Sequence, residues 1–170
     1  MPRPTLAFVA VAWVAVVAAC GSDTTTPASK IVNFKATMNA AAEVQATAVT
    51  SSGTGTFTAT LDTSTNVFIY DVTYAGLTSN VTAGHIHGPA TTAASSGTTI
   101  NFGTLPGATF VTGASSGTAH GQATLNAANQ ITATINGDSL RKVLFAGLTY
   151  ANIHTTTYGA GEIRGQILQQ

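Results

Sequence analysis

A strict alternation of apolar and polar residues constrains the fold of this chain more than any other feature. In residues 32–38, 57–61 and 68–74, every second residue is apolar. Successive side chains of a β-strand point to opposite faces, so this pattern is typical of strands with one buried face. Similar short segments follow at residues 81–87, 119–125, 131–135, 151–154 and 162–168. Turn residues separate them, which predicts an all-β domain, either an antiparallel β-sandwich or a Greek-key barrel.

One segment, residues 138–147, has helical rather than strand spacing. Asp138 is placed to act as an N-cap, Leu140 and Leu144 are four residues apart, and Gly147 stands where helices commonly end. We expect one short helix here, crossing from one sheet to the other. The segment also contains the Gly-Asp-Ser-Leu string of a family of serine esterases. No histidine with an oriented acidic partner follows it, so we expect no esterase.

The N-terminal residues have the features of a bacterial lipoprotein signal. A short apolar run at residues 6–17 ends in Val17-Ala-Ala-Cys20, and the run is shorter than the ~20 residues that span a bilayer. The pattern predicts a signal peptide over residues 1–19, lipidation of Cys20 and a flexible tether over residues 20–29. A transmembrane anchor is the alternative. We expect a lipid-anchored protein of the cell envelope, facing the periplasm or the exterior.

Residues 30–170 are long enough for one β domain with a real core. Without residues 1–19, the chain has five Lys or Arg against six Asp or Glu. No basic stripe is present, so we expect no nucleic-acid partner. Cys20 is the sole cysteine, so the domain has no disulfide.

Three of the four histidines fall in two distinctive blocks, Ala83-Gly-His-Ile-His-Gly-Pro-Ala90 and Tyr150-Ala-Asn-Ile-His-Thr155. His85 and His87 project from one side of a strand, ~6 to 7 Å apart. Imidazole suits copper and zinc, so this pair can supply two ligands, with His154 as the candidate third. His120 is a further candidate if its strand is a neighbour. In the alternative interpretation, the histidines bind loop carbonyls and no metal cofactor is present.

Charged residues near these blocks are candidates for supporting roles. Metal-bound histidines usually donate to a further acceptor, and Glu162 or Asp71 could accept that hydrogen bond. Glu162 and Arg164 are two residues apart on one face of the last strand, which predicts a structural clamp at the sheet edge. Alternatively, the guanidinium of Arg164 orders the carbonyls of the loop at residues 150–157.

Taken in order, the motifs resemble the CHRD domain, a family named for repeats in chordin that also occurs as single exported bacterial domains. The resemblance covers nearly all of residues 30–170. It departs from the family at Gln45-Ala46, where prolines are frequent, and at His120. It implies a binding or structural module whose ligand is not specified and which is not expected to be an enzyme. The blocks that carry the resemblance are Glu43-Val44, Tyr74-Ala-Gly-Leu77, Ala83–Ala90, Tyr150–Thr155 and Gly161-Glu-Ile-Arg-Gly-Gln-Ile167.

The histidine spacing is also similar to the copper half of copper/zinc superoxide dismutases. That similarity implies His85, His87 and His154 as copper ligands, with His120 as a further candidate. The zinc loop, the disulfide and the arginine beside the late histidine are not found, so we expect no efficient dismutase. The second hypothesis is therefore a copper- or zinc-binding protein with a storage or weak redox function.

Overall fold

The structure is a computed structural model that describes residues 1, 30–129, 131–132 and 135–170. The predicted signal peptide (1–19), the lipidation site Cys20 and the tether (20–29) lie outside the described residues, and the strand expected at 131–135 does so in part. Within the described part, no helix is both long enough and apolar enough to cross a membrane.

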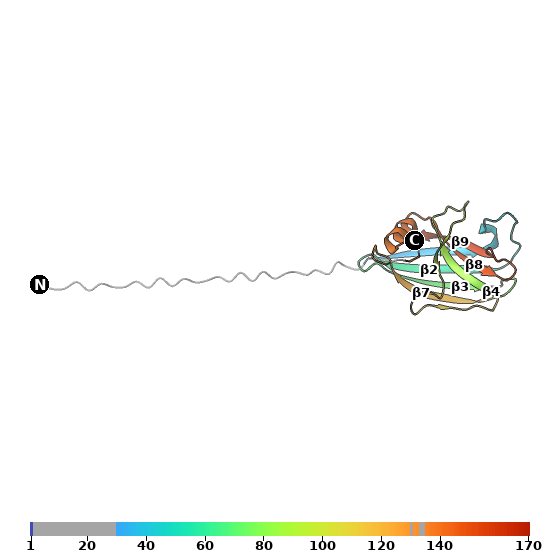
Figure 1. Ribbon diagram of the computed structural model, residues 1–170, viewed down its shortest axis with the longest axis horizontal. Coiled ribbons are helices and arrows are strands. Elements are labelled where there is room, and N and C mark those ends of the chain that lie inside the picture. The colour runs from blue at the N-terminus through green and yellow to red at the C-terminus, as the bar shows by residue number, and fades with distance from the viewer. Residues whose placement is uncertain (2–29, 130, 133–134) are drawn as a thin grey trace.

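The described residues form one antiparallel sheet of nine strands, which curls into a half-barrel (Figure 1). The strand order is β5-β4-β8-β9-β1-β2-β3-β7-β6. This confirms the prediction of an all-β antiparallel domain with one short helix. The elements are β1 (Ile31–Asn39), η1 (Ala40–Ala42), β2 (Thr54–Asp62), β3 (Val67–Ala75), β4 (Val81–His87), β5 (Thr98–Asn101), β6 (Thr109–Phe110), β7 (Gly117–Thr124), α1 (Gly137–Phe145), β8 (Thr149–Thr155) and β9 (Ile163–Gln169).

The alternating pattern sets the register of β1, β2 and β3. Ala36, Phe57 and Val72 lie side by side across the three strands, and all three are buried on the inner face. Phe57 and Tyr70 stack there with their ring centroids 6.1 Å apart. The outer face of the same strands is polar and rich in threonine, whose branched side chain suits a pleated, half-exposed surface. One buried face per strand therefore fixes which residues meet.

Helix α1 differs in two details from the sequence expectation. Its N-cap is Asn136, whose side chain accepts a hydrogen bond from the Ser139 amide at 2.9 Å. Asp138 lies in the first turn instead and pairs with Lys142 at 2.8 Å, so its prediction as the N-cap was wrong. The helix connects β7 to β8 within one sheet rather than crossing between two. It adds buried Leu140 to the core.

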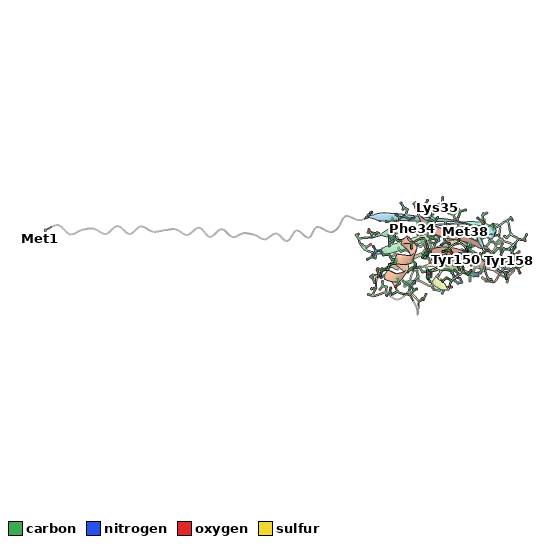
Figure 2. All side chains as sticks on the ribbon, turned by 90° about the horizontal axis from the view of Figure 1, so that it is seen from above. Met1, Phe34, Lys35, Met38, Tyr150 and Tyr158 are labelled. Carbon is green, nitrogen blue, oxygen red and sulfur yellow. The ribbon has the colours of Figure 1, made fainter. Side chains whose placement is uncertain are left out.

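Strands β4, β8 and β9 are buried on both faces. Ile86, Ala151 and Ile163 point into the core. The opposite face is polar, yet loops 43–53 and 88–97 cover it and donate or accept its hydrogen bonds. We call this face the polar layer and define it by Tyr150, Asn152, His85, His87, His154, Arg164 and Gln166. Tyr150 is buried. In Figure 2 it lies toward the middle of the domain, and Tyr158 lies toward the end remote from the start of β1.

The close approach of β9 to β1 gives a test of this packing. A Cβ atom at Gly165 would lie 2.4 Å from the carbonyl oxygen of Thr37, so Gly165→Ala must push the two strands apart. We expect a loss of about 3 kcal/mol in the free energy of unfolding, measured by urea denaturation. Gly159→Ala is the control, because a Cβ there meets no atom within 4 Å. Equal stability of the two variants would contradict the packing described.

Candidate functional site

Strands β4 and β8 bring the two histidine blocks together. They are antiparallel neighbours in which His85 lies opposite Asn152 and His87 lies opposite Tyr150. Residues two apart on a strand share a face, so His154 lies on the same face as both histidines of β4. Ile86 points the other way and is buried in the core. The alternation that predicts the strands therefore also places three histidines on one face.

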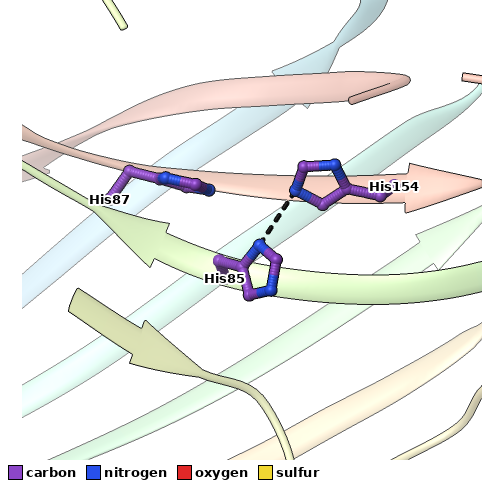
Figure 3. Close-up of side chains that lie close together, drawn as sticks. All are labelled: His85, His87 and His154. Atoms are coloured by element: carbon purple, nitrogen blue, oxygen red, sulfur yellow. Dashed lines mark hydrogen bonds between the residues drawn. The ribbon is translucent and has the colours of Figure 1, made fainter. Parts of the chain in front are cut away.

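The three imidazoles converge into a compact group, which we call the histidine cluster (His85, His87 and His154). One ring nitrogen from each lies within 4.8 Å of the others. His85 Nδ1 and His154 Nε2 are 2.9 Å apart, the contact drawn as a dashed line in Figure 3. His120 is not part of the group. It lies on the outer face of β7, where its Nδ1 is 2.8 Å from Asp71.

Backbone carbonyls fix the outward nitrogens of two of these rings. His87 Nδ1 lies 3.0 Å from the carbonyl oxygen of Ser96, and His154 Nδ1 lies 3.0 Å from that of Gly159. A carbonyl oxygen only accepts, so each Nδ1 carries the proton and each Nε2 keeps a lone pair. His87 Nε2 is buried without a hydrogen-bond partner in the described part of the chain. The Nε2 lone pair of His154 accepts a hydrogen bond from His85 Nδ1, whereas that of His87 has no such partner in the described part of the chain.

Glu162 and Asp71 were predicted as possible hydrogen-bond acceptors for the histidine rings. The acceptors observed are instead the carbonyl oxygens of Ser96 and Gly159. Asp71 pairs with His120, and Glu162 is bound elsewhere. The backbone of two loops thus does what a carboxylate was expected to do.

Burial keeps the cluster uncharged. Loss of solvent, together with the neighbouring histidines, lowers the pKa of His85 to about 4. Burial also lowers the pKa of His87 to about 4, against the opposing effect of its carbonyl bond, and it lowers the pKa of His154. All three imidazoles are neutral at pH 7, which is the protonation state that binds metal ions.

Two further side chains of the polar layer pack beside the cluster. The ring of Tyr150 stacks on His87 with centroids 4.8 Å apart and planes 6° from parallel. The guanidinium carbon of Arg164 lies 3.6 Å from the centroid of the Tyr150 ring. Two groups at these distances cannot share one ring face, so Tyr150 is held between His87 and Arg164. Arg164 is buried and donates to the carbonyls of Thr91 and Ala94, rather than to the loop at 150–157.

Glu162 does not pair with Arg164, although both are buried. Its carboxylate accepts hydrogen bonds from Ser51 Oγ at 2.5 Å, Thr155 Oγ1 at 2.6 Å, and the amide and hydroxyl of Thr78 at 2.7 and 2.9 Å. Burial alone would raise the pKa of Glu162, but these four donors together hold it below its usual value. The predicted pair with Arg164 at a sheet edge is therefore wrong: Glu162 precedes β9, which is an interior strand of the sheet, and its partners are hydroxyl groups and an amide.

The sequence analysis missed Tyr150, Asn152, Glu43 and Gln166 as members of this site. Asn152 Nδ2 donates to Glu43 Oε1 at 2.6 Å, and Gln166 Nε2 donates to the Ala90 carbonyl at 2.9 Å. Tyr150 and Asn152 stand four and two residues before His154, so alternation could have placed them on its face. Glu43 reaches the layer from the loop after η1, which no pattern within one strand signals.

A histidine cluster set in a buried polar layer, on the outer side of an antiparallel half-barrel, defines a small all-β domain with one candidate binding centre in its described part. The family model described as CHRD domain matches residues 34–167, which include the three histidines of the cluster. The chain therefore belongs to the CHRD family, as its motifs indicated. No curated protein and no solved structure matches it.

Glu43 gives the polar layer a measurable pH dependence. Burial raises its pKa to about 7, although Gln45, Arg164 and Asn152 oppose the shift, whereas the unfolded chain has the model-peptide value of 4.5. The folded state therefore retains a proton that the unfolded state loses between pH 4.5 and 7, so this contribution to stability falls as pH rises through that window.

We expect Glu43→Gln to be less affected by the rise in pH, because the variant cannot ionise at this position. The measurement is the urea midpoint of both proteins at pH 4.5, 5.5, 6.5 and 7.5. Subtracting one urea midpoint from the other at each pH removes the contribution of the other titrating groups, because both proteins contain them. A difference that stays constant across this range would rule out a raised pKa at Glu43.

Proposed function

We propose that this CHRD domain is a lipid-anchored, extracytoplasmic binding module of a bacterial cell envelope. The anchor is supported by the Val17-Ala-Ala-Cys20 box after a short apolar run, and by the position of the chain's sole cysteine. The proposed tether, residues 20–29, directly precedes the described domain, whose first strand β1 begins at Ile31. The domain would be attached to the membrane by the lipid, and we propose the histidine cluster as the place where its ligand binds.

The anchor is tested by Cys20→Ser. We expect this variant to lose lipidation and to move from the membrane to the soluble fraction, because a thioether-linked lipid requires the thiol. Fractionation followed by mass spectrometry of the N-terminus is the measurement, with Thr25→Ser in the tether as control. If Cys20→Ser stays processed and membrane-bound like the parent, the protein is not a lipoprotein.

As a second candidate function we propose binding of one copper or zinc ion, which one observation supports: the close approach of the three histidines of the cluster. Three imidazoles offer nitrogens within 4.8 Å of one another, and two of them have their other nitrogen held by a carbonyl. Such outer hydrogen bonds are the usual support of metal-bound histidine. The donor set is all nitrogen, which suits copper and zinc, and three protein ligands leave one coordination position open. Storage or weak redox chemistry is the function that this set would serve.

The alternative is that these histidines only fix the covering loops. The carbonyl bonds of His87 and His154 would serve both purposes equally well. The two functions differ at His87 Nε2, which loop fixing leaves without a partner, as six other buried polar side-chain atoms of the described residues are. Leaving a buried polar atom unsatisfied costs ~1 to 3 kcal/mol, and a metal ion would remove that cost.

Titration calorimetry of the purified, metal-free protein with Cu(II) and with Zn(II) tests the second function. We expect one equivalent to bind, and a His85→Asn/His87→Asn double variant to bind at least 100-fold more weakly. His120→Asn is the matched control and should bind like the parent, because His120 lies outside the cluster. Equal affinity of the parent and the double variant, or no binding by either, would leave the histidines as loop-fixing residues.

A further inference from the structure

We infer that Arg164 is the positioning residue of His87: it holds loop 88–97 over the polar layer, and the Ser96 carbonyl of that loop fixes the Nδ1 proton of His87. The orientation of the His87 ring and the direction of its Nε2 lone pair then depend on a residue that does not touch it. The consequence for metal affinity rests on the proposed metal-binding function, whereas the consequence for the protonation pattern of His87 does not.

The contacts of Arg164 lie at the centre of loop 88–97. Its Nη2 donates to the carbonyl oxygens of Thr91 and Ala94, both at 2.9 Å. Gln166, two residues further along β9, donates to the Ala90 carbonyl at 2.9 Å. Arg164 therefore forms hydrogen bonds to two carbonyls in the middle of loop 88–97, and Gln166 forms one near the start of the loop.

A second connection runs through Tyr150. Its ring is stacked between Arg164 and His87, and its hydroxyl lies 3.2 Å from the amide nitrogen and 3.3 Å from the carbonyl oxygen of Ser96. The same carbonyl lies 3.0 Å from His87 Nδ1. Ser96 is thus the point at which the loop, Tyr150 and His87 meet. Arg164 contacts the surroundings of Ser96 in two ways. It donates hydrogen bonds to the backbone of the same loop, and it stacks on the Tyr150 ring, whose hydroxyl contacts Ser96.

The environment of Arg164 indicates that its role is not to pair charge. Its side chain is 2% exposed, and neither ion pair found among the described residues involves it. A buried guanidinium without a carboxylate in contact is costly, so stability alone would favour an apolar residue at this position. What an apolar residue cannot do is donate to two loop carbonyls while stacking on an aromatic ring.

The test is the pattern of imidazole ¹⁵N shifts in the full-length, metal-free protein in detergent. In the parent we expect His87 protonated at Nδ1 and bare at Nε2. In Arg164→Gln we expect the His87 signals to move toward an average of the two tautomers. His154 is the internal control, because its Nδ1 bond to Gly159 does not involve the loop, and its signals should stay unchanged. Arg141→Gln, on α1, is the matched control for loss of an arginine.

If Arg164→Gln does not fold, two more conservative variants provide the same test. Arg164→Lys keeps the charge but lacks the planar guanidinium that stacks on Tyr150 while donating to Thr91 and Ala94. Tyr150→Phe keeps the ring but removes the hydroxyl contact with Ser96. We expect both to shift His87 and to leave His154 in place. His87 signals that match the parent in these variants, or a parent His87 protonated at Nε2, would overturn the inference.

Copper and zinc affinity is the second measurement, and it separates this inference from the proposed function. Loss of such an outer hydrogen bond typically weakens metal binding 10- to 100-fold, which is what we expect for Arg164→Lys. If the parent shows the expected tautomer but binds no metal, the metal function fails and the positioning role stands. If the parent binds metal and Arg164→Lys retains both its affinity and its His87 signals, the positioning role is wrong.

Discussion

The requirement that buried polar groups be hydrogen-bonded governs the side of this domain that carries the histidine cluster. An ordinary half-barrel would present the outer face of β4, β8 and β9 to water. Here that face is covered by loops 43–53 and 88–97. The strands beneath donate to the Glu43 carboxylate and to the carbonyls of Thr91 and Ala90, and the Tyr150 hydroxyl accepts from the Ser96 amide. Arginine, glutamine and asparagine on the strands therefore order the loops, and the loops in turn bury the histidines.

This mutual dependence links the block Ala83–Ala90, which contains His85 and His87, to the block Gly161–Ile167, which contains Arg164. The block that contains His85 and His87 runs directly into loop 88–97, and the block that contains Arg164 supplies the donors that hold that loop. Strand β8, which carries His154, lies between them in the sheet. Three of the five blocks that carry the CHRD resemblance are thus neighbours on adjacent strands, although 80 positions of sequence separate His85 from Gly165.

The strands and the convergence of the histidines could be predicted because alternation acts over two residues and is visible in the chain. Period two places His85 and His87 on one face and Ile86 in the core, as observed. Loop carbonyls were one of the two kinds of acceptor that the sequence offered, but the particular carbonyls, those of Ser96 and Gly159, could not be predicted because every residue carries one. The partner of Glu162 was misjudged for a related reason: scarce charge suggested Arg164, whereas hydroxyl groups, which are abundant in this chain, satisfy it. The N-cap of α1 was misplaced by two residues, since Asn136 and Asp138 are both good capping residues.

The carboxylate of Glu162 has a consequence for the order in which the chain assembles. Its donors come from Ser51, Thr78 and Thr155, which belong to three segments far apart in sequence. Such contacts close long stretches of chain, and this buried anion is fully solvated by protein only when all three segments have arrived. Until then the group is better left in water. Thr155 is only seven residues from Glu162, so the full set of donors depends on bringing the distant segments around Ser51 and Thr78 to this end of the half-barrel.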